Sequence, residues 1–528
     1  MRILIISVSI LFTLLSCKNH TNTDLDNKAP VSKKPNILFL SIDDLRPDLG
    51  TYGNLEIKTP NIDKLASSSM VMLNTHSQTA VCAPSRASTM LGYRPDSTQV
   101  WHLGDEFRKI NPDAVTMPQY FNKAGYYTVN IGKIFHNYMP DSISWNEPDL
   151  RPAPYNTEAH LKRDGETYWY TKEGQDIQVR ARDSLKRVRK GRKLYGDGWG
   201  HGPAVEFGDL PDSIYYDAKQ TKLALETIDR IKDKNQPFFM GLGFFRPHLP
   251  FVAPKKYWDL YPEGSISPAA NPKLPENAPV MAANSNYELR SYHHPYKIGR
   301  PEDEPLPATY ADTLKRGYYA TVSFVDVLVG ELIEGLKERD LYDNTIIVIW
   351  GDHGYKLGDH NGWGKQTNFR IDTHVPLIIK PANLSKGQRI EALAELVDIF
   401  PTLCDLAGVE KADYFQGTSM TPLFDNPNLE WKEAVFTQFR RRPNISKDGK
   451  EYMGYSMQTK QYHYVEWYHW DNNKKEKGAF ATSELYDHSI DPTELRNVAG
   501  DLEKKDVVQR LSEQLARGWK GAIPKNSL

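Results

Sequence analysis

The chain has 528 residues, which is enough to bury a sizeable core and long for a single domain. Its 66 Lys and Arg residues nearly balance its 67 Asp and Glu residues. The near-zero net charge gives no support to a protein that binds nucleic acid or an anionic membrane surface through a strongly basic face.

The first residues, MRILIISVSILFTLLSC, form a basic tip and an apolar run that is too short to span a bilayer. Leu15-Ser16-Cys17 resembles the lipid-attachment box of bacterial lipoproteins. We therefore predict a lipoprotein signal over residues 1–17 and a flexible tether over 18–34. The protein is expected to be exported to the periplasm or the outer membrane or cell surface, with a lipid on Cys17 as its only membrane contact. An ordinary signal peptide with an incidental cysteine is the alternative.

Five short apolar runs predict buried strands of a mostly parallel sheet. They cover residues 36–44, 126–136, 237–248, 345–354 and 374–380. Helical patterns lie between them, in TPNIDKLASSS and at residues 316–340. Strands that alternate with helices predict an α/β sandwich, which we assign to a main domain over residues 35–430.

Two stretches, 150–200 and 262–308, break this alternation, and we expect long surface loops there, where binding specificity tends to reside. After about residue 430 the pattern changes to strand-like segments at 433–439 and 454–470, followed by a helix at 506–520. This change predicts a smaller α+β subdomain over residues 431–528.

The first four predicted strands each run into polar, reactive side chains at their carboxyl ends. In chain order these are Asp43 and Asp44, Lys133 and His136, Arg246 and His248, and Asp352 and His353. Because open α/β sheets bind ligands at the carboxyl ends of their strands, four such endings predict a single site.

Three of these side chains are carboxylates, those of Asp43, Asp44 and Asp352, and His353 adds an imidazole. The chain must turn at Asp43-Asp44 for both to face one site, because neighbours in a strand point to opposite faces. Buried like charges repel unless a cation joins them, so the set predicts one hard divalent ion such as Ca²⁺. Helix-capping aspartates are the alternative for either pair alone.

Cys82 begins the stretch CAPSRASTMLGYRPD and is one of two cysteines beyond the signal. Pro84 suits the first turn of a helix that ends near Gly92. The thiol then lies at the positive end of the helix dipole, with Arg86 one turn along. Cys404 lies in an apolar helical pattern and is expected to be buried. We expect Cys82 to be free, although the sequence alone leaves a bridge to Cys404 open.

CAPSR at residues 82–86, followed by LGYRP at 91–95, resembles the signature of type I sulfatases. The stretches DDLRPDLGTYGN, VCAPSRAS, GKIFH, RPHLPF, GDHGYKLGDH and THVPLI are similar to the iduronate-2-sulfatase group of that family. The resemblance implies an alkaline-phosphatase-like sandwich and a sulfuric ester hydrolase. It also implies that a formylglycine-generating or anaerobic sulfatase-maturing enzyme oxidises Cys82 to formylglycine.

Carried over residue by residue, the resemblance gives each side chain a role. Asp43, Asp44, Asp352, His353 and the modified Cys82 would hold one Ca²⁺, and many sulfatases have Asn where this chain has His353. One hydroxyl of the formylglycine hydrate would attack sulfur and the other would later expel sulfate. Arg86 and Lys133 would hold the hydrate, and His136 would take a proton during sulfate release. His248 and Lys365 would contact the ester and protonate the departing alcohol.

Two other functions remain open at this point. One is a phosphatase or phosphodiesterase of the same superfamily, which would use Ser or Thr as nucleophile and commonly two zinc ions. The other is a non-catalytic lipoprotein that binds sulfated glycans, although such a protein should have lost Cys82, Arg86 or a metal ligand.

The expected substrate is a sulfated polysaccharide or its oligosaccharides, with a 2-O-sulfate on a terminal sugar. A sulfated uronic acid of a glycosaminoglycan is the family default, and a neutral 2-sulfated sugar of an algal polysaccharide is its rival, because Glu451 would repel a uronate. The basic run 184–193 could hold a polyanion or be an ordinary solvated surface. Trp169 could stack on a sugar or pack under its loop.

Overall fold

The computed structural model describes residues 34–136, 139–152, 169–188, 201–443 and 448–524. Residues 34–528 form one compact unit. Within the described ranges, no helix is long and apolar enough to cross a membrane. The predicted signal, Cys17 and nearly all of the tether lie outside these ranges.

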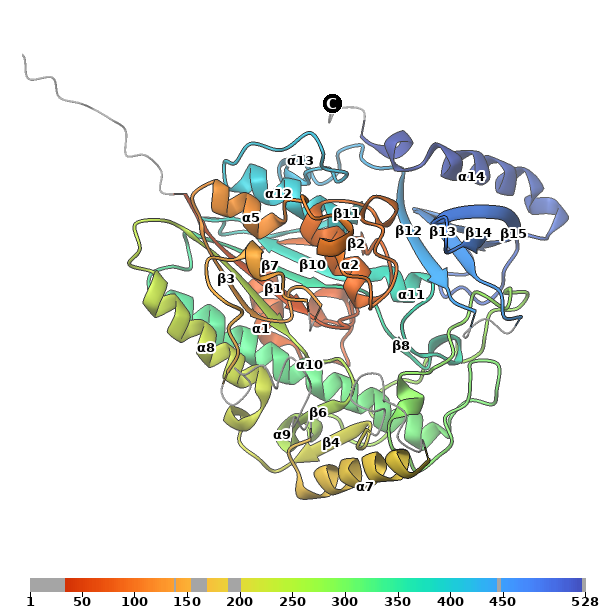
Figure 1. The fold of residues 1–528 in the computed structure, drawn as a ribbon, viewed down its shortest axis with the longest axis horizontal. Coiled ribbons are helices and arrows are strands. Elements are labelled where there is room, and N and C mark those ends of the chain that lie inside the picture. Colours follow the sequence, from red (N-terminus) through yellow and green to blue (C-terminus); the bar gives the residue numbers. More distant parts are fainter. Residues whose placement is uncertain (1–33, 137–138, 153–168, 189–200, 444–447, 525–528) are drawn as a thin grey trace, which may run out of the picture. The chain divides into compact units, whose positions relative to one another are not determined.

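A seven-stranded sheet forms the centre of this unit (Figure 1). Its order is β11 (Gln388–Glu395), β2 (Met70–His76), β10 (His374–Lys380), β7 (Thr345–Gly351), β1 (Asn36–Ile42), β5 (Phe238–Phe244) and β3 (Tyr127–Gly132). Only β10 runs antiparallel to its neighbours, so the predicted mostly parallel sheet is confirmed.

All five predicted strands form, and the sheet has two more, β2 and β11. The sequence analysis missed β2 because its MVMLNTH follows directly on a helix and turns polar at its end. It missed β11 because QRIEALAE carries charges among its apolar residues.

The antiparallel β10 also differs from a fully parallel arrangement. Since antiparallel neighbours need no crossover, the connection 352–373 starts and ends at the same edge of the sheet.

Helices cover both faces of the sheet (Figure 1). One face packs against α1 (Pro60–Ala66), α8 (Tyr216–Ile231) and α10 (Ala308–Lys337), with the larger apolar core between them. The other packs against α2 (Cys82–Leu91), α5 (Met117–Lys123), α12 (Ile399–Leu406) and α13 (Thr421–Asp425). Two cores, one on each face, are what an α/β sandwich requires.

Apart from the C-terminal sheet and its helix, which follow below, the remaining elements are short or peripheral. They are the strands β4 (Val205–Gly208), β6 (Phe251–Pro254), β8 (Lys356–Leu357) and β9 (Trp363–Gly364), the helices α3 (Pro95–Thr98), α4 (Phe107–Ile110), α7 (Lys172–Val188), α9 (Lys255–Trp258) and α11 (Arg370–Thr373), and the 3₁₀ turns Gly50–Tyr52, Ser142–Ser144, Asp212–Ile214, Leu289–Ser291, Asp359–Asn361, Leu396–Asp398, Leu502–Lys504 and Trp519–Ala522.

The loop predicted over 150–200 is wrong for residues 172–188, which form α7, because the sequence there alternates charged and small apolar residues at helical spacing. Trp169 is buried and its indole N–H donates to the Pro203 carbonyl at 2.8 Å, so it packs under its loop and offers no face to a sugar. The side chains of the basic run from Lys186 onward lie outside the described part.

The C-terminal region forms a four-stranded antiparallel sheet of β12 (Ala434–Arg441), β13 (Tyr452–Thr459), β14 (Tyr462–Asp471) and β15 (Glu476–Asp487). Helix α14 (Lys505–Arg517) packs on it through Leu511. The α+β character predicted here is confirmed. The single strand-like stretch 454–470 is in fact two strands that turn at Lys460 and Gln461. The boundary between residues 430 and 431 stays a prediction.

Candidate active site

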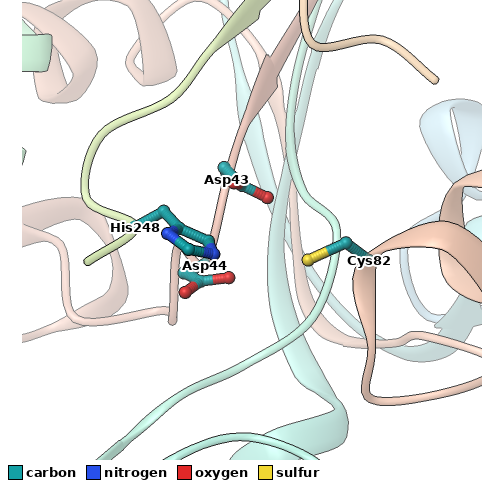
Figure 2. Close-up of side chains that lie close together, drawn as sticks. All are labelled: Asp43, Asp44, Cys82 and His248. Atoms are coloured by element: carbon teal, nitrogen blue, oxygen red, sulfur yellow. The ribbon is translucent and has the colours of Figure 1, made fainter. Parts of the chain in front are cut away.

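The carboxyl ends of four adjacent strands meet at one edge of the central sheet. Strands β7, β1, β5 and β3 are parallel neighbours in that order. The polar residues that follow them therefore converge, as the sequence predicts. Figure 2 shows Asp43 and Asp44 after β1, His248 after β5 and Cys82 at the start of α2, all facing one another.

Asp43 and Asp44 share the site because the chain turns at the second of them. Strand β1 ends at Ile42, and Asp44 adopts a left-handed backbone with φ 59°. Aspartate tolerates this conformation better than most residues, and the turn brings two consecutive carboxylates to one side. The backbone N–H of Asp44 donates to Asp352 Oδ1 at 3.0 Å, which joins the ends of β1 and β7. All three aspartates are fully buried.

Cys82 is the first residue of α2, and the preceding Val81 is extended. One ligand atom each from Asp43, Asp44, Cys82 and His248 lie within 4.8 Å of one another. Neither Cys82 nor Cys404 is in a disulfide, as expected. Burial raises the pKa of the Cys82 thiol well above its usual value, although Lys133 and Lys365 oppose the rise. The unmodified side chain is therefore a neutral thiol and a poor nucleophile.

Two buried cations compensate the carboxylates next to Cys82. Arg86 donates through Nε to Asp352 Oδ2 at 2.9 Å and through Nη2 to Asp43 Oδ1 at 3.1 Å. Lys133 Nζ forms an ion pair with Asp43 Oδ2. The Coulombic effect of Lys133, with smaller ones from other cations, outweighs burial and holds the pKa of Asp43 well below its usual value. The aspartate is therefore ionised in the folded protein.

The residues predicted to hold a divalent ion are all present in one cluster. Cys82 groups with Asp352 and His353, as it does with Asp43 and Asp44. His353 Nδ1–H donates to the Gly354 carbonyl at 2.9 Å, which leaves Nε2 with a lone pair. Nε2 lies 3.4 Å from Asp44 Oδ1 and 3.7 Å from Asp352 Oδ2.

Lone pairs that face one another in a buried site repel, and a bound cation removes this repulsion. A histidine that donates its other ring N–H to a carbonyl is the usual form of a metal ligand. The donor set of three carboxylates and one imidazole therefore fits a divalent metal ion, and its predominance of oxygen favours a hard one.

Lys365 and His248 complete the charged cluster around Asp44. Lys365 Nζ contacts both oxygens of Asp44, at 2.8 and 2.7 Å. Glu288, which the sequence analysis did not single out, bridges the two: its Oε2 lies 3.3 Å from Lys365 Nζ and its Oε1 lies 3.1 Å from His248 Nε2. Its only sequence signal is its place in the loop 262–308, which we predicted to carry specificity.

His136 lies at the edge of this cluster. It lines a small hollow with Arg86, Ala83 and Asp105. The structure thus places it beside Arg86. Every predicted site residue therefore lies in or beside one cluster at the carboxyl edge of the sheet.

Comparison with known proteins identifies the family. The model of the family described as Sulfatase matches residues 35–409, and that described as N-sulphoglucosamine sulphohydrolase, C-terminal, matches residues 358–520. The chain is 31% identical to iduronate 2-sulfatase of Homo sapiens over 90% of its own length and 93% of that protein. It is 30% identical to a sulfatase of Formosa agariphila, over 96% and 90% of the two chains.

Among solved structures, the phosphonate monoester hydrolase of Silicibacter pomeroyi superposes with a TM-score of 0.69 at 24% identity, covering 93% of this chain and 96% of that one. At this identity the likeness shows the fold, which is the alkaline-phosphatase-like sandwich expected from the sequence. The family match extends over most of the chain and includes Cys82, Arg86 and the three buried aspartates. The chain belongs to the sulfatase family and is a sulfuric ester hydrolase.

Proposed function

We propose that this protein removes sulfate, in the 2-O position, from a terminal sugar of a sulfated polysaccharide or its oligosaccharides. The observation that carries the proposal is the cluster of three buried aspartates and His353 around Cys82, with His248 and Lys365 alongside. The 2-O position and the sugar substrate are supported by the similarity to iduronate 2-sulfatase.

Cys82 would act as formylglycine, whose hydrate supplies a hydroxyl for attack on sulfur next to a divalent ion that stabilises the developing negative charge. Arg86, which is fixed by Asp43, Asp352 and the Ile134 carbonyl, holds its charge in one position beside residue 82. Lys133 supplies a second fixed cation there. Neither cation has to reorganise as negative charge develops, which is the basis of electrostatic catalysis.

His248 is suited to protonate the departing alcohol. Burial and Lys365 lower its pKa, but the carboxylates of Asp44 and Glu288 raise it more, so the pKa of His248 lies above its ordinary value. A histidine that is protonated near neutral pH is an effective general acid. Lys365, whose Nζ contacts Asp44, would place a second positive charge near the oxygen of the departing alcohol. His136, beside Arg86, is the candidate proton acceptor for sulfate release.

The acidic Glu451 does not exclude a uronate. Its Oε1 lies 2.5 Å from Arg440, so its charge is compensated. Arg442 lies close enough to Arg440 and Glu451 for the three charges to influence one another. The repulsion on which the neutral-sugar alternative depended is therefore weakened, and we favour a 2-sulfated uronic acid.

The first prediction concerns residue 82. Cys82→Ala should reduce sulfate release by about a thousandfold or more, because it removes the nucleophile and leaves the fold intact. Peptide mass mapping of the wild type, produced together with a maturation enzyme, should show residue 82 as the aldehyde. Full turnover by Cys82→Ala, with an unchanged circular dichroism spectrum, would refute the mechanism.

The second prediction concerns the metal, which we propose is a single Ca²⁺. Removal of divalent ions with a chelator should abolish turnover, and Ca²⁺ should restore it, because three buried carboxylates select a hard cation. Asp44→Asn should weaken Ca²⁺ binding, while Asp259→Asn, at the exposed position that follows α9, should not. Elemental analysis that finds two zinc ions per active chain would instead favour a phosphatase-like enzyme.

The third prediction concerns Glu288. Glu288→Gln should lower kcat/KM by roughly 10- to 100-fold, which is the usual effect of losing a contact that supports a site residue. The change removes the carboxylate that Lys365 and His248 share. Glu263→Gln, an exposed change in the same loop, is the matched control. Equal kinetics for both variants would show that Glu288 has no positioning role.

The fourth prediction concerns the substrate. In a panel of defined sulfated di- and trisaccharides, 2-sulfated uronic acids should release sulfate fastest, followed by neutral 2-sulfated sugars. Ion chromatography of free sulfate measures both. Activity restricted to 6-sulfated hexosamines or aryl sulfates would overturn the assignment of the 2-O position.

The fifth prediction concerns location, for which we propose a lipid-anchored, exported protein. The support is the Leu15-Ser16-Cys17 box after a short apolar run. In detergent phase partitioning the wild type should enter the detergent phase and Cys17→Ala should stay in the aqueous phase. Aqueous partitioning of both proteins would rule out the lipid.

A further inference from the structure

A hollow of about 350 Å³ lies on the C-terminal sheet, outside the catalytic cluster. Its lining joins two chain regions that are far apart in the sequence: α3 with the segment that follows it, and strands β13 to β15 with the turn between the last two. The residues are Asp96, Gln99, Trp101, Tyr455, Trp470, Lys475, Glu476 and Lys477. Aromatic rings with a polar rim are the usual composition of a small-molecule binding site.

Two tryptophans form the floor of this hollow. The rings of Trp101 and Trp470 meet edge to face, with centroids 5.1 Å apart, and both pack on Met453. Each tryptophan is more than nine-tenths buried, with 4% and 7% of its surface exposed. Within the described ranges, neither indole N–H has a hydrogen-bond partner. An indole N–H can only donate, so each of these two buried tryptophans leaves a donor without an acceptor.

The charged residues at the rim are two carboxylates that have partners and two exposed lysines, of which Lys475 also donates to Asn472 Oδ1 at 2.8 Å. Asp96 accepts a hydrogen bond from Gln438 Nε2 at 2.7 Å, and Glu476 lies 3.6 Å from Lys474 Nζ. Lys475 and Lys477 are exposed and lie over aromatic rings of the hollow, with Nζ 5.9 Å from the centre of Trp101 and 5.5 Å from that of Tyr455. Because an ammonium has three N–H groups, both lysines can still donate to a ligand, and that ligand must supply acceptors.

Two short segments connect the lining of this hollow to residues in or next to the catalytic cluster. The backbone N–H of Trp101 donates to Asp105, and Asp105 lines the small hollow that contains Arg86 and His136. On the other side, Asn368, three residues after Lys365, donates to the Gly454 carbonyl next to Tyr455. The chain segments that line the hollow therefore contact the segments that carry Asp105 and Lys365.

We propose that this hollow is a subsite for a sugar unit further along the same substrate chain, one that bears hydroxyl and sulfate or carboxylate oxygens. The proposal rests on the proposed function for the identity of the substrate. The exposed parts of the aromatic lining would pack against the sugar, and Lys475 and Lys477 would pair with its anionic group.

The test uses the full chain with Cys82→Ala, which binds substrate without turnover. A tetrasaccharide and a disaccharide with the same 2-sulfated terminal uronic acid are titrated by calorimetry. The tetrasaccharide should bind about tenfold more tightly. Adding Lys475→Ala and Lys477→Ala should remove that difference, and adding Trp470→Phe, which makes the aromatic lining smaller, should reduce it. Lys474→Ala in the same turn, whose side chain is 69% exposed and does not line the hollow, should preserve it.

Equal affinity for the two saccharides, no binding of either, or a length preference that survives the double lysine change would overturn the subsite. The proposed function fails separately, if the wild type releases no sulfate from any saccharide. In that case a length preference that depends on the lysines would still establish the hollow as a saccharide site. Thermal melting of each variant shows whether a loss of binding reflects a loss of fold.

Discussion

The burial of three carboxylates at one sheet edge is the constraint on which the site depends. An isolated buried carboxylate costs several kcal/mol, so each must be paired. Asp43 pairs with Lys133 and Arg86, Asp352 pairs with Arg86, and Asp44 pairs with Lys365. These partners come from α2, from the end of β3 and from the connection after β7, so the charges join parts of the chain that are remote in sequence.

This pairing also sets the charge that a substrate meets. Three carboxylates and three fixed cations cancel, so the cluster is close to neutral before any metal ion binds. A divalent cation in the same cluster would make it positive by two charges, in a dry environment where such a charge acts strongly. A sulfate monoester carries one negative charge, and the excess positive charge suits its binding and the further negative charge that develops during transfer.

The sequence indicated the site well because its residues follow strands. Asp43, Asp352 and His248 come directly after apolar runs, and parallel strands bring such endings together without any knowledge of the loops. Cys82 and Arg86 were found because their motif lies at a helix start. Lys365 was placed only by resemblance, because it lies in a connection whose path depends on β10 being antiparallel.

What the sequence could not show are the contacts that irregular segments make. Glu288 has no local pattern around it, and its role appears only where its loop meets Lys365 and His248. The pair Trp101 and Trp470 is separated by most of the chain, and each tryptophan alone reads as a core residue. Periodicity predicts which face of an element is buried but not which irregular segment covers it.

The C-terminal sheet belongs to the site as much as to its own subdomain. Arg441 on β12 is fully buried, and it donates to the carbonyl of Met281 at 2.8 Å and to that of Gln366 at 2.9 Å. It thereby fixes both the loop that carries Glu288 and the segment that carries Lys365.

On the neighbouring strand β13, a Cβ at Gly454 would clash with Asn368 Nδ2 and would lie 2.8 Å from the Trp467 ring, so only glycine allows this close approach. The central sheet therefore carries the buried aspartates, and the C-terminal sheet helps to set the position of the segments that carry Lys365 and Glu288. Since β12 and β13 contact Gln366 and Asn368, near Lys365, a change in the C-terminal sheet can alter the position of Lys365.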